Sequence, residues 1–349
     1  MRILEDAAVG SFERVVHAVD EDCGLRAIVA VHSTAAGPAV GGTRFRPYPS
    51  DACATLDALR LAEGMTLKAA AAGLPVGGGK AVIVGDPERL RSPELWRAYA
   101  GVVDLFDGAY VTAEDVGTCV ADMAALRRHT PHVLGLPDGR AGGWDGDPSP
   151  LTARGVVAAV RAAWEGEAGP GALRGARAVV QGTGKVGAAV AGLLAAEGAR
   201  LWVCDADPAR AAAVARRTGA AVIDPDEALT RPCDVLVPCA LGGVLRPGTV
   251  PELRCRWVAG SANNQLSDDA VADLLAERGI GYVPDFIANA GGLMAVAEQL
   301  NGWDRDRVAA RVDAIGPLVA ELIAEARARG ETTLRAARRR AGARLPAAA

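Results

Sequence analysis

Lysine is rare in this chain, and two of the lysines flank a run of glycines. The 349 residues contain three lysines, Lys68, Lys80 and Lys185, among 38 lysine and arginine residues in total. Arginine stays charged at any accessible pH, whereas a buried ammonium can lose its proton and act as a base, an acid or a nucleophile. The positions that keep lysine are therefore the first candidates for chemistry.

The neighbours of Lys68 and Lys80 favour a chemical role over chance retention on a solvated surface. Residues three and four positions from Lys68 are glycine, methionine and alanine, so no carboxylate is placed for a helical ion pair. Lys80 opens the apolar run at 81–84, which predicts a buried strand. Burial and a nearby second ammonium would both lower the pKa of an amine at the mouth of that strand.

The segment GTGKVG at 182–187 follows an apolar strand and opens a helix, which is the context that a dinucleotide-binding fingerprint requires. The next strand ends in Asp205, whose carboxylate can accept hydrogen bonds from ribose hydroxyls and would repel a 2′-phosphate. This predicts NAD rather than NADP, with Arg210 and Arg216 as cations that could reverse the preference. The alternative, glycines that only make a tight turn, leaves Asp205 unexplained.

Asp115 follows a predicted strand at 109–112, at the end where open α/β sheets place their ligands. A helix N-cap or turn aspartate is the alternative. A nicotinamide cofactor, a lysine that can lose its proton, a second lysine to hold a carboxylate and an aspartate for proton transfer form a consistent set for oxidising an amino acid.

The predicted elements that position these residues alternate between helix and strand, which indicates an α/β fold with a mostly parallel first sheet and a doubly wound second sheet. A Gly, Pro and Asp-rich stretch at 136–150 is expected to connect two domains or form a loop. We expect a substrate and oligomerisation domain at 1–135, a Rossmann-type domain at 136–330 and a tail at 331–349 that packs back on the first domain. Predicted strands lie at 27–32, 81–84, 109–112, 177–181, 200–205, 234–237, 257–259 and 281–283, and predicted helices at 51–73, 93–105, 152–165, 186–197 and 208–218.

Composition excludes several classes of protein. A net charge of −4 argues against nucleic acid as the main partner, and no apolar run approaches the roughly 18 residues that span a bilayer. The seven scattered cysteines fit neither a disulfide framework nor a metal site, so we expect a cytoplasmic protein without a metal. The one basic cluster, at 335–344, predicts a solvated or frayed helix end.

Several motifs together resemble the leucine/valine/phenylalanine branch of the amino-acid dehydrogenase family, and the resemblance runs from about residue 27 to residue 330. It implies a substrate domain, then a cofactor domain, with a deep cleft between them. The motifs are GGTR at 41–44, GMTLKAAAAGL at 64–74, GGGK at 77–80, TAEDVGT at 112–118, PCALGG at 238–243, ANNQ at 262–265 and NAGG at 289–292.

The resemblance implies a role for each matching position. Lys80 would be the catalytic base, Asp115 would relay a proton to or from the amino group, and Lys68 would bind the substrate carboxylate. Gly42 and Asn263 would also contact the substrate, whose side chain would meet Val40, Ala113, Leu293 and Val296. The cofactor would contact Gly182, Gly184, Lys185, Val186, Gly187, Asp205, Thr152, Ala240, Asn263 and Asn289.

The activity implied is reversible NAD-dependent deamination of valine, leucine or isoleucine to the 2-oxo acid and ammonia, by a homo-oligomer. An aromatic amino-acid dehydrogenase with the same machinery is one alternative. A catalytically silent NAD-binding regulatory protein is another, although such a protein would not need Lys68, Lys80 and Asp115.

Overall fold

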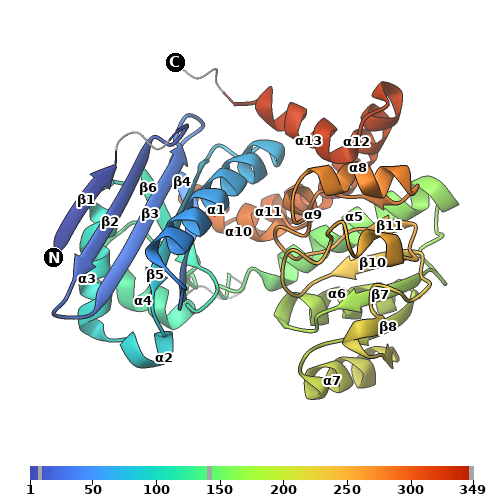
Figure 1. The fold of residues 1–349 in the computed structure, drawn as a ribbon, viewed down its shortest axis with the longest axis horizontal. Helices are drawn as coiled ribbons and strands as arrows, with labels where there is room; N and C mark the ends of the chain where they lie inside the picture. Colours follow the sequence, from blue (N-terminus) through green and yellow to red (C-terminus); the bar gives the residue numbers. More distant parts are fainter. Residues whose placement is uncertain (7–9, 140–143, 346–349) are drawn as a thin grey trace. The chain divides into compact units, whose positions relative to one another are not determined.

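The computed structural model describes residues 1–6, 10–139 and 144–345, so parts of two predicted segments, 140–143 and 346–349, lie outside the described residues. The chain forms two compact units (Figure 1). One comprises Met1–Asp147, Val296–Arg305 and Ala341–Ala349, and the other comprises Pro148–Ala295 and Asp306–Arg340.

The first unit is built on a six-stranded sheet with the order β1-β2-β3-β5-β4-β6. Its first three pairings are antiparallel, and β4 pairs in parallel with both β5 and β6. The expected mostly parallel sheet is therefore wrong, because the short connection between β2 and β3 leaves room only for a hairpin. The strands are β1 (Arg2–Asp6), β2 (Arg14–Asp20), β3 (Leu25–Ser33), β4 (Ala39–Arg46), β5 (Gly77–Val84) and β6 (Tyr110–Glu114).

Helices cover both faces of this sheet (Figure 1). The long helix α1 (Asp51–Ala71) begins at the N-cap Ser50, whose side chain accepts a hydrogen bond from the Cys53 amide. The alanines of α1 pack on apolar side chains of β2, β3 and β5. The opposite face packs on α3 and α4 around aromatic side chains. The remaining helices of this part are α2 (Pro87–Leu90), α3 (Pro93–Asp104) and α4 (Val120–Arg127).

The second unit contains a six-stranded sheet in which every pairing is parallel. Its order, β12-β11-β10-β7-β8-β9, reverses direction between β7 and β10, as in a doubly wound nucleotide-binding sheet. This confirms the predicted Rossmann-type fold. The strands are β7 (Arg177–Gln181), β8 (Arg200–Cys204), β9 (Ala221–Val222), β10 (Val235–Pro238), β11 (Trp257–Val258) and β12 (Gly281–Tyr282).

The helices after residue 148 alternate with the strands of that sheet along the chain or come after its last strand, β12. Two of these elements, β7 and α7, begin and end at the residues predicted from the sequence. None of the described helices is both long and apolar enough to cross a membrane. The helices are α5 (Ser149–Ala168), α6 (Lys185–Ala196), α7 (Pro208–Thr218), α8 (Ala270–Glu277), α9 (Asp285–Ala288), α10 (Gly291–Glu298), α11 (Arg305–Asp313), α12 (Ile315–Arg329) and α13 (Thr333–Gly342), with short 3₁₀ turns η1 (Pro225–Glu227), η2 (Val250–Glu252) and η3 (Gln299–Asn301).

The first unit extends past the expected boundary at residue 135, to Asp147. It also includes a later segment of the chain, Val296–Arg305, which begins near the end of α10. The Gln299 side chain accepts a hydrogen bond from the Gly135 amide at 2.7 Å and donates one to the Leu136 carbonyl at 2.6 Å. Trp144 stacks on Trp303 with ring centroids 5.0 Å apart. These contacts hold 135–147 and 296–305 in one compact body.

The arginine-rich C-terminal segment is a packed helix, so the expectation of a solvated or frayed end is wrong. Leu334 and Ala337 are buried, because α13 has an apolar face between its arginines. Arg335 forms an ion pair with Asp273 of α8, and Arg338 forms one with Asp269, the N-cap of that helix, both in the second unit. Beyond α13, Arg344 donates hydrogen bonds to the last carbonyls of α1 in the first unit.

Candidate functional site

Lys80 lies inside a strand, not at its mouth as the sequence suggested. It is the fourth of the eight residues of β5, because the glycine run at 77–79 is itself part of that strand. A Cβ atom at Gly77 would collide with the Ser33 carbonyl, and one at Gly78 would collide with Thr66 of α1. The glycines thus let β3 and α1 approach β5 closely, and Lys80 is left only 5 % exposed.

Asp115 follows the end of β6 and is held by the backbone around it. The Asp115 amide donates to the Thr118 hydroxyl at 2.8 Å, and that hydroxyl is within hydrogen-bonding distance of the Thr43 carbonyl at 2.9 Å. A Cβ at Gly42 would collide with the Glu114 carbonyl and lie 2.9 Å from the Asp115 Cβ. Glycine at position 42 is therefore what allows β4 to lie against the Asp115 turn.

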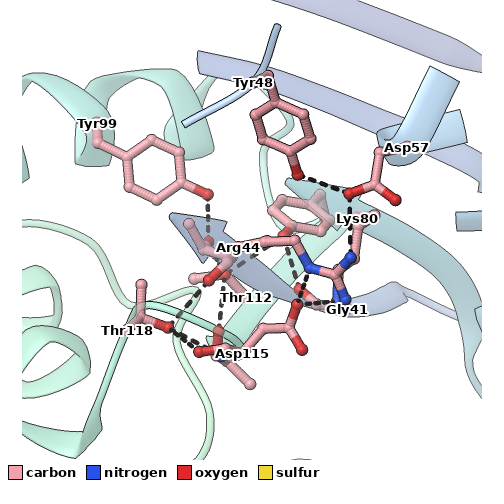
Figure 2. Close-up of polar contacts among 12 residues, drawn as sticks. Gly41, Arg44, Tyr48, Asp57, Lys80, Tyr99, Thr112, Asp115 and Thr118 are labelled. Carbon is pink, nitrogen blue, oxygen red and sulfur yellow. Dashed lines mark hydrogen bonds and ion pairs between the residues drawn. The ribbon is translucent and has the colours of Figure 1, made fainter. Parts of the chain in front are cut away.

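The two predicted proton-transfer residues form an ion pair. Lys80 Nζ is 2.9 Å from Asp115 Oδ2, and Arg44 Nε is 2.9 Å from the same oxygen (Figure 2). Burial lowers the pKa of Lys80, the Asp115 charge opposes that effect and the Arg44 charge adds to it, so the net pKa lies below the ordinary lysine value. Burial alone would raise the pKa of Asp115, but the two cations lower it to about 2.

Sequence reasoning missed the residues on the far side of Arg44. Arg44 Nη1 is 3.0 Å from Asp57 Oδ2, and the Tyr48 hydroxyl donates to that same oxygen at 2.6 Å (Figure 2). Arg44 belongs to the motif GGTR at 41–44, but the sequence predicted no role for it. No spacing in the sequence connects it to Asp57 of α1, because their contact depends on how α1 packs against the sheet.

The residues expected to contact the substrate divide between the two units. Val40 on β4, Ala113 on β6 and Val296 on α10 belong to the first unit and are at most 9 % exposed. Leu293, also on α10 and 7 % exposed, belongs to the second unit. Lys68 lies in the last turn of α1 and is partly buried. Their common pocket stays a prediction.

The glycine-rich turn between β7 and α6 has the shape that a pyrophosphate needs. Gly182 has φ +95°, and a Cβ there would lie 2.7 Å from the Ala240 amide nitrogen. A Cβ at Gly187 would collide with the Gly182 carbonyl, so the turn and the helix start are tightly packed. Gly184, the N-cap of α6, has open space where a side chain would be. Lys185 and Val186 begin the helix, so their amides lie in its first turn, where anions bind.

Asp205 follows β8 and is fixed as an ionised carboxylate. Its Oδ2 accepts the Thr183 amide at 2.6 Å, and its Oδ1 accepts the Asp207 amide at 2.9 Å. Burial acts to raise the pKa of Asp205, but these amides and the Thr183 hydroxyl outweigh it, and the pKa is lowered. Arg210, a cation that could have favoured NADP, pairs with Asp207 at 3.2 Å.

Three further predicted residues belong to the second unit: Asn263 and Asn289 follow β11 and β12, and Thr152 lies in the first turn of α5. The Asn289 Nδ2 donates to Asn263 Oδ1 at 2.9 Å and to the Ser261 carbonyl at 3.1 Å. The Asn289 Oδ1 is buried and has no hydrogen-bond partner among the described residues, so it suits an N–H donor such as a carboxamide. The Thr152 hydroxyl donates to the Pro148 carbonyl at 2.9 Å. With the open Gly184 turn, these groups fit a nicotinamide dinucleotide.

The second unit is defined by its sheet order and glycine turn as a dinucleotide-binding domain, and the first presents a buried lysine–carboxylate pair. Residues 12–132 match the Glu/Leu/Phe/Val dehydrogenase dimerisation domain, and residues 206–348 match the Glutamate/Leucine/Phenylalanine/Valine dehydrogenase domain. The chain belongs to the glutamate/leucine/phenylalanine/valine dehydrogenase family. It is an amino-acid dehydrogenase, an oxidoreductase acting on CH–NH₂ donors.

Relatives align over nearly the whole chain. A leucine dehydrogenase of Bacillus cereus is 41 % identical over 345 residues, covering 99 % of this chain and 94 % of the relative. A valine dehydrogenase of Streptomyces coelicolor is 44 % identical over 339 residues, covering 96 % and 93 %. The crystal structure of L-tryptophan dehydrogenase from Nostoc punctiforme superposes with a TM-score of 0.81 at 37 % identity and 96 % coverage of both chains. The leucine and valine dehydrogenases of this family are NAD-dependent, and NAD is the cofactor here.

Proposed function

We propose that this protein carries out the reversible NAD-dependent oxidative deamination of a branched-chain aliphatic L-amino acid to the 2-oxo acid and ammonia. The observation that carries the proposal is the Lys80–Asp115 ion pair. The residue at every position of the expected side-chain pocket is apolar, which supports an aliphatic substrate. NAD supplies the hydride acceptor for this chemistry.

The residues of the first unit divide the proton transfers between them. Lys68 keeps its charge and binds the substrate carboxylate, while Lys80 in its neutral form takes a proton from the water that attacks the iminium carbon. Both cations contact Oδ2 of Asp115, and no hydrogen bond from the described residues reaches Oδ1. That leaves Oδ1 to exchange a proton with the substrate amino group.

The second unit binds and orients the cofactor. Amides of the turn from Gly182 to Gly187 would bind the pyrophosphate, and Asp205 would accept hydrogen bonds from the ribose hydroxyls. Ala240, which packs against Gly182, forms the neighbouring wall of that turn. Thr152 and Asn289 Oδ1, which has no hydrogen-bond partner among the described residues, would contact the carboxamide, and Asn263 would position Asn289 through their shared hydrogen bond.

The substrate preference follows from the side-chain pocket. Val40, Ala113, Leu293 and Val296 offer no cation to a glutamate side chain, and burying that carboxylate unpaired is costly. Ala113 and Leu293 leave less room than glycine for an aromatic ring, and overfilling costs about 1–3 kcal/mol. Valine, leucine and isoleucine should therefore be used ahead of phenylalanine and glutamate.

One assay tests the proposal: NADH formation at saturating NAD with each of the twenty amino acids. We expect the highest kcat/KM among valine, leucine and isoleucine. An aromatic substrate is the second candidate, favoured by the similarity to the tryptophan dehydrogenase; a higher kcat/KM with phenylalanine or tryptophan would select it. NADH binding without turnover of any amino acid would instead indicate a silent regulatory protein.

The same proposal includes a cytoplasmic homo-oligomer. The match of residues 12–132 to a dimerisation domain supports self-association, and the seven free cysteines support a reducing compartment. Light scattering of the purified protein tests the first part. We expect a mass that is a multiple of 35.7 kDa, and a monomer at micromolar concentration would contradict it.

A further inference from the structure

Asp115 is in contact with two cations of different kinds. Lys80 can lose its proton, whereas a guanidinium cannot. The side chains of Arg44 and Asp115 are 14 % and 18 % exposed, and that of Lys80 is 6 % exposed, so water screens these charges weakly. The contribution of each charge therefore depends strongly on the others.

The charges of this cluster balance only while Lys80 is protonated. Arg44 and Lys80 are then matched by Asp57 and Asp115 (Figure 2). When Lys80 gives up its proton, Asp115 would be a buried carboxylate without a cation if Arg44 were absent. Burying an unpaired carboxylate costs free energy, so loss of the Lys80 proton would be disfavoured. With Arg44 in place, Asp115 keeps a hydrogen-bonded counter-charge throughout.

Arg44 is itself held in position by α1 and by the loop before it. Its Nε contacts Asp115 while its Nη1 contacts Asp57 Oδ2, a separation that a single ammonium cannot span. The Tyr48 hydroxyl donates to the same Asp57 oxygen at 2.6 Å and so fixes that carboxylate. The guanidinium thus links the end of β6 to α1, the helix that carries Lys68.

We propose that Arg44 is a positioning residue that supplies the counter-charge Asp115 needs when Lys80 is neutral, and that Asp57 and Tyr48 hold its guanidinium in place. This rests on the proposed function, in which neutral Lys80 is the base. The charged groups acting on Lys80 come from three places: Asp115 after β6, Arg44 on β4 and Asp57 on α1. Tyr48, in the loop between β4 and α1, acts on Arg44.

The test compares the pH dependence of kcat/KM in the full-length wild type and in Arg44→Met. In the wild type, activity should rise with pH as Lys80 loses its proton. Removing the cation should raise the midpoint of that rise by at least about one pH unit, with activity down at least about tenfold at neutral pH and largely recovered at alkaline pH. A lower plateau with an unshifted midpoint is what a merely structural role gives, and it would overturn the proposal.

Two further variants keep the test decisive. Arg44→Gln removes the same charge but keeps a hydrogen-bonding side chain, and it replaces Arg44→Met if that variant does not fold. Tyr48→Phe removes one neutral hydroxyl, so it should shift the midpoint in the same direction by less. An unshifted midpoint in Tyr48→Phe would overturn the part of the proposal that concerns Asp57 and Tyr48.

Arg26→Met is the matched control. Arg26 also links a strand of this sheet to α1, through an ion pair with Asp51, the first residue of that helix, but this ion pair is exposed to solvent. Its loss should leave the pH midpoint unchanged, and NADH titration checks that the second unit of every variant is folded. If the wild type deaminates no amino acid, the proposed function fails; if it is active and Arg44→Met has the wild-type midpoint, only the positioning role fails.

Discussion

The two sheets hold their functional groups in different ways. In the second unit they lie in turns beyond parallel strands, and backbone amides and glycines do most of the positioning, as at Gly182 and Asp205. In the first unit Lys80 projects from within a strand, and side chains from β4, β6 and α1 fix its surroundings. In the proposed function, cofactor binding therefore depends on local backbone shape, whereas proton transfer depends on a buried balance of charges.

Lys80→Arg should have the largest effect and should separate the two regions. It keeps the positive charge but forbids deprotonation, so turnover should fall at least about 10²-fold, as for a lost general base. NADH binding, measured by fluorescence titration, should be unchanged. Turnover near that of the wild type would show that proton transfer does not depend on a neutral Lys80.

Asp205→Ser should disturb only the second region. Without the carboxylate, repulsion of a 2′-phosphate disappears, and the ratio of kcat/KM for NAD over NADP should fall about tenfold, or about 1.4 kcal/mol. The pH midpoint of activity should stay the same, because the charges that act on Lys80 are those of Asp115, Arg44 and Asp57 in the first unit.

Asp224→Ser is the control for Asp205→Ser, since Asp224 is an exposed aspartate that caps a turn after a strand of the same sheet. It should leave the cofactor ratio as it is. A wild type that prefers NADP would mean that Asp205 does not determine the sign of the charge where the adenosine ribose binds.

Ala113→Gly should give the smallest effect and should sharpen the account of the first region. Removing the methyl group enlarges the expected side-chain pocket, so the ratio of kcat/KM for phenylalanine over leucine should rise by the equivalent of about 1 kcal/mol, the lower end of the range for one methylene. Ala27→Gly removes a methyl from the core of the same sheet and should cost stability without changing that ratio. If Ala113→Gly and Ala27→Gly have the same ratio of kcat/KM for phenylalanine over leucine, Ala113 does not line the side-chain pocket.

Local patterns made the second unit easier to predict than the first. β7, the glycine turn and Asp205 lie within a short stretch whose signals are all consecutive, and the structure has the predicted strand at 177–181. In the first unit the strands β1, β2 and β4 went unpredicted, and the glycine run at 77–79 was not recognised as strand. Glycine disfavours strands by itself, and only close packing of β3 and α1 against β5 requires it there.

The sequence by itself determined the doubly wound sheet, the dinucleotide turn and the candidate residues Lys80 and Asp115, because each depends on residue type and short-range spacing. Only the tertiary structure decided that Arg44 contacts both Asp115 and Asp57, and that Tyr48 completes the set. These contacts join β4, β6 and α1 through sheet register and helix packing. The energy of a buried charge depends on every charge within a few ångströms of it, and the sequence does not give those distances.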